Sequence, residues 1–390
     1  MALITNSDKQ WQTPDDICAH VGDDYAQHHG AIVPPIYQNS LFVQDGANGP
    51  YTYSREANPT VEVAERKIAA LEGAQGALCF ASGMAAISSA ILHFVRAGSH
   101  LVMVGTAYGP TRRFAAVYLK ERLGVETTFV NGSCPQEIFD AVRENTRLIY
   151  LESPSSLVFH MQDLDAVSAF AHSRGIGTVI DNTYATPLHQ QPLLHGIDIS
   201  CHTASKYMGG HSDIVAGALA ASAEIVESIR KNERELFGAC MDPHQAWLLA
   251  RGLRTLPVRL KRHGESGKKV AAYLESRAEV VRVNYPGSAT YPQKELFARY
   301  LTGTNGLLSF QLRTTPEQVR RFVASLRVFQ RGVSWGGFES LAWPVSLDAT
   351  PGPERPGAAP DGVRLHVGLE EPSTLIADLE QAFASLRESV

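Results

Sequence analysis

The sequence has 390 residues, 44% of them hydrophobic and 19% charged, so the chain can bury a large core and its length favours two or three domains. Its formal net charge of -5 gives no reason to expect nucleic acid or an anionic membrane as a partner. The five cysteines include no C-x-x-C pair, and the N-terminus shows no secretory signal. These observations indicate a reducing, cytoplasmic compartment and argue against a disulfide framework.

The first 60 residues show little regular pattern, and we expect an extended arm there. The segment that follows is predicted to be a helix, with Pro59 near its start and Gly73 as its stop. Its apolar residues recur on one helical face, at Val61, Ala64, Ile68 and Leu71.

An apolar run over residues 77–95 is nearly long enough to span a membrane. It contains serines, a glycine and a histidine, which divide it better into a buried strand, a turn at Ser82 and Gly83, and a helix. Because the same order of strand and helix recurs along the chain, we expect no membrane partner.

Short apolar segments are predicted to be strands, at residues 76–80, 100–105, 126–130, 147–152, 177–182 and 199–202. Helical patterns separate several of them, as at residues 135–145 and 164–175. Apolar strands that alternate with helices indicate an α/β domain with a mainly parallel sheet covered on both faces. Ligands of such sheets bind beyond the carboxyl ends of the strands.

The alternation ends after about residue 250, where residues 251–277 indicate a long helical connection with an irregularity at Pro257. Further strands are expected at residues 280–285, 307–312 and 363–369, and residues 349–362 are expected to form a surface loop. The last helix carries a buried stripe at Leu375, Leu379, Phe383 and Leu386. We therefore expect an arm over residues 1–60, a large α/β domain over 61–250 and a smaller α+β domain over 251–390.

Two ionisable residues stand at the ends of neighbouring predicted strands. Asp181 ends one apolar segment, at a position where burial is costly without a cationic partner. Lys206 follows the next segment and lies between small hydroxylated residues and a Gly-Gly pair. A buried Asp–Lys ion pair is the structural interpretation, and a nucleophilic amine in a ligand site is the functional one.

Other residues at the same edge of the sheet favour the functional interpretation. The hydroxyls of Thr203 and Ser205 suit phosphate oxygens, and Gly83 and Met84 begin a predicted helix whose N-terminus attracts an anion. Tyr108 follows another strand and offers a flat ring. A phosphate site, an aromatic ring, a buried carboxylate and a lysine together match the needs of pyridoxal 5'-phosphate, and no metal is expected.

The chain also resembles a known family in motifs that follow one another along almost its whole length: YSREANPT, ASGMAA, AYGPT, LESPSS, DNTYATP, ASKYMGGHSD, RGLRTLPVRL, SWGGFESL and VRLHVGLE. These motifs are similar to those of the Cys/Met-metabolism family of pyridoxal-phosphate enzymes. The resemblance implies the aspartate-aminotransferase-like fold type I. The tryptophan of SWGGFES and the serine pair of ESPSS look most like bacterial cystathionine β-lyases.

The resemblance implies a role for each residue around the cofactor. Lys206 would form the Schiff base, Asp181 would pair with the pyridine nitrogen, and Tyr108 would stack on the ring. Tyr53 and Arg55 would reach the phosphate in a neighbouring subunit. The site therefore needs a homo-oligomer, at least a dimer, and a tetramer of two dimers is expected.

Further residues are implied to hold the phosphate, namely Gly83, Met84, Thr203 and Ser205. On the substrate side, Arg364 would bind the α-carboxylate of a small-molecule amino-acid substrate, for which a bidentate fork is suited. Ser334 and Trp335 would line the same side.

The implied activity is β-elimination of L-cystathionine or a related cysteine thioether to a thiol, pyruvate and ammonia, with Tyr53 and Tyr108 assisting proton transfers. A γ-acting lyase or synthase on a homoserine ester or thioether is the alternative, because the motifs do not separate the two. Glu56 stands where some β-lyases carry a second basic residue, which leaves recognition of the distal end of the substrate open. A binding or regulatory protein on the same fold is the non-enzyme alternative, against which Lys206 argues.

Overall fold

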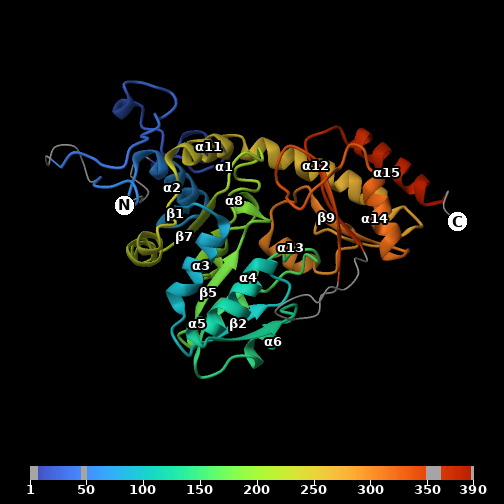
Figure 1. Ribbon diagram of the computed structural model, residues 1–390, viewed down its shortest axis with the longest axis horizontal. Coiled ribbons are helices and arrows are strands. Elements are labelled where there is room, and N and C mark those ends of the chain that lie inside the picture. Colours follow the sequence, from blue (N-terminus) through green and yellow to red (C-terminus); the bar gives the residue numbers. More distant parts are fainter. Residues whose placement is uncertain (1–7, 45–50, 348–361, 388–390) are drawn as a thin grey trace.

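The structure is a computed structural model that describes residues 8–44, 51–347 and 362–387. Figure 1 shows two regions, each built around a sheet, joined along one side by the long helix α12 (Leu256–Glu275). Of the loop expected over residues 349–362, only Gly362 lies within the described residues, and it begins a strand. The domain boundaries at residues 60 and 250 stay a prediction.

The first region contains a seven-stranded sheet in the order β1-β7-β6-β5-β4-β2-β3. Its strands are β1 (Gly76–Phe80), β2 (His100–Val104), β3 (Glu126–Val130), β4 (Thr146–Glu152), β5 (Gly177–Asp181), β6 (Ile199–His202) and β7 (Gly217–Ala221). Only β7 runs antiparallel to its neighbours within this sheet. The prediction of a mainly parallel sheet is therefore confirmed.

Helices cover both faces of this sheet (Figure 1). The helices of this region are α2 (Pro59–Glu72), α3 (Gly83–Phe94), α4 (Gly109–Arg113), α5 (Lys120–Leu123), α6 (Pro135–Asp140), α7 (Leu164–Ser173), α8 (Thr186–His189), α9 (Ala223–Ile229), α10 (Glu235–Phe237) and α11 (Pro243–Arg254). Side chains alternate along β1, so that Leu78 and Phe80 join one hydrophobic core while Ala77 and Cys79 join a second core with α2. Strands buried on both faces explain the continuous apolar runs in the sequence.

Helix α2 forms as predicted. Asn58 caps its N-terminus by accepting a hydrogen bond from Thr60, and Pro59 occupies the first turn. Gly73 ends it in the left-handed conformation, with a φ of 65° that glycine adopts without strain. The helix therefore stops just before β1, and its last residue, Glu72, is buried beneath the sheet.

The second region contains a five-stranded sheet in the order β10-β11-β12-β9-β8. Its elements are β8 (Val280–Asn284), α13 (Lys294–Tyr300), β9 (Leu307–Leu312), α14 (Pro316–Ser325), β10 (Gln330–Arg331), β11 (Leu341–Val345), β12 (Gly362–His366) and α15 (Pro372–Arg387). The predicted stripe of α15 is confirmed, since Leu375, Leu379 and Phe383 are buried and Leu386 packs on the same core.

The N-terminal segment differs from the extended arm expected over residues 1–60. Helix α1 (Pro14–His20) forms within it and packs against α2, α11 and α12, with Ile17 and Cys18 buried. Thr13 caps this helix and Pro14 occupies its first turn, which stabilises a short helix that periodicity alone does not reveal. Residues 31–44 and 51–58 contain no helix and agree better with the expected arm.

The remaining short turns of helix are η1 (Asp8–Gln10), η2 (Tyr25–His28), η3 (Phe114–Leu119), η4 (Pro192–His195) and η5 (Arg230–Arg234). The apolar run over residues 77–95 is β1, a turn and α3, as predicted. Within the part of the chain that the structure describes, no helix combines the length and the apolarity needed to cross a bilayer.

Candidate active site

A cavity of about 190 Å³ opens at the carboxyl ends of β4, β5 and β6, where the second region packs against the first. The residues predicted to form the site and found in its wall are Tyr108, Asp181, Thr203, Lys206, Ser334, Trp335 and Arg364. They come from both sheets and from the loop before β11, so more than 250 residues of chain separate the first from the last. The cavity therefore lies beyond the strand ends, where the sequence predicts the site.

The floor of the cavity carries two buried carboxylates. Glu152 and Asp181 end the adjacent strands β4 and β5 and are paired in register, with 7% and 5% of their surface exposed. Asp181 accepts hydrogen bonds from the peptide N–H of Thr183, at 3.0 Å, and from its hydroxyl. Glu152 accepts from the Tyr108 peptide N–H at 2.7 Å and from the Ser156 hydroxyl at 2.6 Å.

These two carboxylates have no cationic partner among the described residues. Burial raises the pKa of Asp181 above its ordinary value, and burial together with the adjacent Asp181 raises the pKa of Glu152. A ligand that brings a protonated ring nitrogen to Asp181 would relieve this unfavourable burial.

Lys206 reaches the same cavity from the turn after β6. Its Nζ donates a hydrogen bond to Ser334 Oγ at 2.8 Å and lies 5.6 Å from the centroid of the Trp335 ring. Burial, with a smaller contribution from the positive charge of Arg364, lowers the pKa of Lys206 to about 8. Because no ion pair joins Lys206 to Asp181 in the described chain, the structural interpretation of the two as an ion pair is not supported.

Arg364, on β12, lines the wall of the cavity that is predicted to receive the substrate. Its Nη2 donates to the carbonyl oxygens of Val333 and Ser334, the second at 3.4 Å, which fixes the guanidinium beside Lys206. Burial lowers the pKa of Arg364 to about 10, so the group remains cationic at neutral pH. A fixed guanidinium at the wall of a cavity is suited to a carboxylate.

The predicted phosphate side is built around Thr203. Gly83 packs so closely against it that a Cβ on residue 83 would lie 2.2 Å from the Thr203 hydroxyl oxygen. Ser82 caps helix α3 by accepting from the Ala85 N–H, and the N–H groups of Gly83 and Met84 bond to no described residue. These two free donors at a helix N-terminus suit an anion, although neither residue lines the cavity itself.

Ser205 does not line the cavity either. Its hydroxyl accepts from the N–H of Ala216 at 2.8 Å and donates to the carbonyl of the same residue at 3.2 Å. The hydroxyl thus ties the lysine turn to the segment before β7. Its predicted contact with a phosphate stays a prediction.

Tyr108 precedes helix α4 and has 45% of its surface exposed at the rim of the cavity. Burial of its phenol, with the negative charges of Asp181 and Glu152, raises its pKa, so the phenol keeps its proton at neutral pH. Tyr53 and Arg55 lie elsewhere. They line a separate hollow with Gln38 and Asp242. Their role in the site of a neighbouring subunit stays a prediction.

Sequence reasoning missed several residues of the wall, of which Glu152, Ser156, Leu157, Thr183 and Tyr184 are examples. Glu152 could have been predicted from the sequence, because it ends an apolar strand in the same way as Asp181. Thr183 gave none, since its contact with Asp181 depends on the turn after β5.

The residues present fit pyridoxal 5'-phosphate. The two unpaired carboxylates can receive a protonated ring nitrogen, Lys206 can bond to an aldehyde carbon, and the N-terminus of α3 beside Thr203 can hold a phosphate. Among the described residues, no group of three or more His, Cys, Asp or Glu side chains could hold a metal ion.

Known proteins similar to this chain agree with the geometry. The profile of the family described as Cys/Met metabolism PLP-dependent enzyme matches residues 15–384. A Rhizobium johnstonii protein, provisionally named a cystathionine beta-lyase, is 40% identical over 377 residues that cover 94% of each chain. An L-methionine gamma-lyase of Pseudomonas putida is 38% identical over 379 residues, which cover 93% of this chain and 95% of the relative.

A solved structure agrees as well. The crystal structure of metB from Corynebacterium glutamicum superposes with a TM-score of 0.91 at 34% identity, and the match covers 97% of this chain and 99% of that one. The predicted α/β fold, the aspartate-aminotransferase-like fold type I, is therefore confirmed. This chain belongs to the Cys/Met-metabolism family of pyridoxal-phosphate-dependent enzymes, and pyridoxal phosphate is its cofactor.

Proposed function

We propose that this chain is a carbon–sulfur lyase that removes a thiol from the β-carbon of L-cystathionine or a related cysteine thioether, leaving pyruvate and ammonia. The observation that carries the proposal is the position of Lys206, whose Nζ lies 2.8 Å from Ser334 Oγ and beside the Trp335 ring, in the cavity that also holds Arg364. An amine, a carboxylate-binding guanidinium and a large aromatic wall thus share one space of substrate size.

In this proposal the residues at the strand ends hold the cofactor. Asp181 pairs with the protonated pyridine nitrogen, Tyr108 stacks on the ring, and Lys206 bonds to the aldehyde carbon. Thr203 and the N–H of Gly83 bind the phosphate. When bound, the cofactor withdraws electron density from the α-carbon of the substrate.

The protein's own groups then act on the substrate. Arg364 binds its α-carboxylate and so orients the Cα–H bond toward Lys206. Lys206 in its neutral form takes the Cα proton, and its pKa of about 8 gives a useful neutral fraction near neutral pH. Tyr108 stands beside this path as a protonated phenol that assists proton transfer. In total, cystathionine and one water give homocysteine, pyruvate and ammonia.

A γ-acting enzyme is the second candidate, and one finding favours it. The L-methionine gamma-lyase relative, at 38% identity, is almost as similar as the relative provisionally named a cystathionine beta-lyase, at 40%. Elimination at Cγ requires a second proton to be taken from Cβ, so the base needs room to move. Trp335 packs 5.5 Å from the Tyr207 ring and 5.6 Å from Lys206 Nζ, which restricts that room and supports the β-reaction.

A homo-oligomer is part of the proposal, at least a dimer, with Tyr53 and Arg55 of one subunit serving the cavity of the next. The apolar side chains of the segment before them support it, since Ile32, Leu41 and Val43 are 74%, 67% and 73% exposed. Such a group of exposed apolar residues is suited to burial against a second copy. We also propose a cytoplasmic location, because the cysteines form no disulfide.

Product analysis with L-cystathionine tests the function. The purified holoenzyme is incubated with the substrate, and the keto acid and the thiol amino acid are identified by mass spectrometry. We expect pyruvate and homocysteine in equal amounts. Equal amounts of 2-oxobutyrate and cysteine would establish the γ-reaction instead, and retained cofactor without turnover of any thioether would indicate a binding protein.

A further inference from the structure

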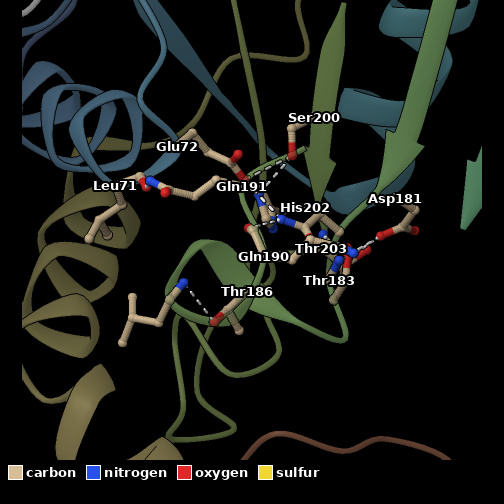
Figure 2. A network of polar contacts seen from close by, with 12 residues as sticks. Leu71, Glu72, Asp181, Thr183, Thr186, Gln190, Gln191, Ser200, His202 and Thr203 are labelled. Carbon is tan, nitrogen blue, oxygen red and sulfur yellow. Dashed lines mark hydrogen bonds and ion pairs between the residues drawn. The ribbon is translucent and has the colours of Figure 1, made fainter. Parts of the chain in front are cut away.

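A second polar cluster lies directly behind the strand ends that carry the site, and Figure 2 shows it. Its centre is Glu72, whose single oxygen Oε1 accepts hydrogen bonds from Ser200 Oγ at 2.8 Å, Asn182 Nδ2 at 3.1 Å and His202 Nε2 at 2.5 Å. Glu72 and His202 are 0% and 1% exposed. One oxygen therefore ties the end of helix α2 to β6 and to the residue that follows β5.

This cluster is joined to the cavity along the chain. Asn182 directly follows Asp181, and His202 directly precedes Thr203. Successive side chains of an extended segment point to opposite faces. Asp181 and Thr203 can therefore face the cavity while Asn182 and His202 face Glu72. Glu72 thus holds the reverse side of two short segments whose front side carries the cofactor residues.

The front side is linked across the same two strand ends. The Thr203 N–H donates to Thr183 Oγ1 at 2.8 Å, and the Thr183 hydroxyl donates in turn to Asp181 Oδ1. A shift of β6 against β5 would therefore disturb the hydrogen bonds of Glu72 behind the strand ends and those of Thr183 in front of them.

Stability alone does not account for the Glu72–His202 pair. Glu72 Oε2 and His202 Nδ1 are buried and have no hydrogen-bond partner among the described residues. Incompletely satisfied buried ion pairs contribute little to stability and are often replaceable by apolar residues. What this pair does provide is a charge-assisted link between the two strand ends on which the cofactor rests.

We propose that Glu72 and His202 form a positioning pair that holds Asp181 and Thr203 in register for the cofactor. The inference rests on the role of Asp181 given under the proposed function. Neither Glu72 nor His202 touches the cavity, so neither is a catalytic residue.

Helix α2 itself offers a matched control. Glu65 lies two turns before Glu72, is 3% exposed, and accepts hydrogen bonds from Cys79 N–H at 2.9 Å and Arg234 Nη1 at 3.2 Å. It contacts neither strand end of the site. Glu65→Gln and Glu72→Gln therefore remove the same charge from the same helix, in the same kind of hydrogen-bonded environment.

The experiment measures the dissociation constant of pyridoxal phosphate from each variant, and the pH at which the visible absorption band of the bound cofactor titrates. The thermal midpoint of each apoprotein reports stability separately. We expect Glu72→Gln to weaken cofactor binding by about tenfold or more, the loss of one charge-assisted hydrogen bond, and to move the titration of the band. Glu65→Gln should change the thermal midpoint alone.

The positioning role would be overturned if Glu72→Gln bound the cofactor with a dissociation constant within about twofold of wild type and left the titration of the band unchanged; twofold is well below the effect of one such bond. Equal changes in Glu65→Gln would overturn it as well. If Glu72→Gln does not fold, the dissociation constant and the titration of the band are measured for His202→Gln instead. Asp181→Asn separates the inference from the proposed function. If Asp181→Asn leaves the cofactor unchanged, the role of Asp181 fails, whereas an effect of Asp181→Asn without one of Glu72→Gln defeats the inference alone.

Discussion

Two regions of this molecule bury lysine and carboxylate side chains, and they differ in whether these charges have partners of opposite sign. Around helix α2, Lys67 lies 3.4 Å from Asp23, and Glu65 lies 3.2 Å from Arg234, so each buried charge has an opposite one. In the cavity at the strand ends, neither Lys206 nor Asp181 has a partner of opposite charge among the described residues.

The comparison separates structural charges from those kept for a ligand. Burial lowers the pKa of both Lys67 and Lys206 to about 8, so the pKa alone does not distinguish the two lysines. What distinguishes them is the surroundings. Lys67 is fully buried in an ion pair, whereas Lys206 faces a cavity and contacts only a hydroxyl and a ring.

The largest expected difference is between substitutions of the two lysines. Lys206→Ala should lower kcat by on the order of a thousandfold or more, because it removes both the attachment point and a base whose proton transfer alone contributes roughly 10²–10⁴. Lys67→Met should keep the activity of the folded enzyme and lose up to about 3–5 kcal/mol of stability, the cost of breaking a buried ion pair. Steady-state kinetics and thermal unfolding measure the two effects, and the opposite pattern would contradict the comparison.

Arg364 provides the next effect. Arg364→Ala should retain the bound cofactor and lower kcat/KM for cystathionine by about 10- to 150-fold, since hydrogen bonds to charged groups contribute about 1.5–3 kcal/mol. Arg364→Lys keeps the charge without the fork and should fall between the two. Loss of the cofactor with unchanged catalysis after reconstitution would remove Arg364 from the substrate side.

The next prediction tests whether Arg55 of one subunit serves the cavity of a second subunit. Inactive Lys206→Ala and inactive Arg55→Ala proteins, unfolded and refolded together, should recover part of the wild-type activity, because one site of each hybrid dimer is then intact. The same treatment of each variant alone is the control. No recovery in hybrids verified by mass would place Arg55 in the site of its own chain.

The smallest expected effect is a pH profile. Capture of the cofactor by the apoprotein requires a neutral Lys206, so its rate should rise about tenfold per pH unit and level off near pH 8. An ordinary lysine, with a pKa of 10.5, would give a rate that continues to rise above that point. Stopped-flow measurement of the visible band between pH 6 and about 10 distinguishes the two curves.

Much of the fold could be predicted from the apolar pattern, and the exceptions have physical reasons. Apart from one leucine, β7 (Gly217–Ala221) consists of glycine and alanine, which are weak strand formers. β11 contains Pro344, which argues against a strand in any sequence-based prediction. Helix α1 is seven residues long, too short for its periodicity to be seen.

The site was predictable to the extent that its residues end strands. Asp181 and Lys206 stand out because a charge follows an apolar run, and the same rule would have found Glu152. Glu72 and His202 could not be found in this way. A glutamate at the end of a helix is normally exposed, and the contact between the two joins residues 130 positions apart.

The measurement that tests the central comparison most directly is chemical. The holoenzyme is reduced with borohydride, digested, and mapped by mass spectrometry for the lysine that carries the pyridoxyl group. We expect the label on Lys206 and none on Lys67, although the pKa of each is about 8, because only Lys206 faces the cavity. A label on Lys67 or on any other lysine would contradict the assignment of the cavity as the active site.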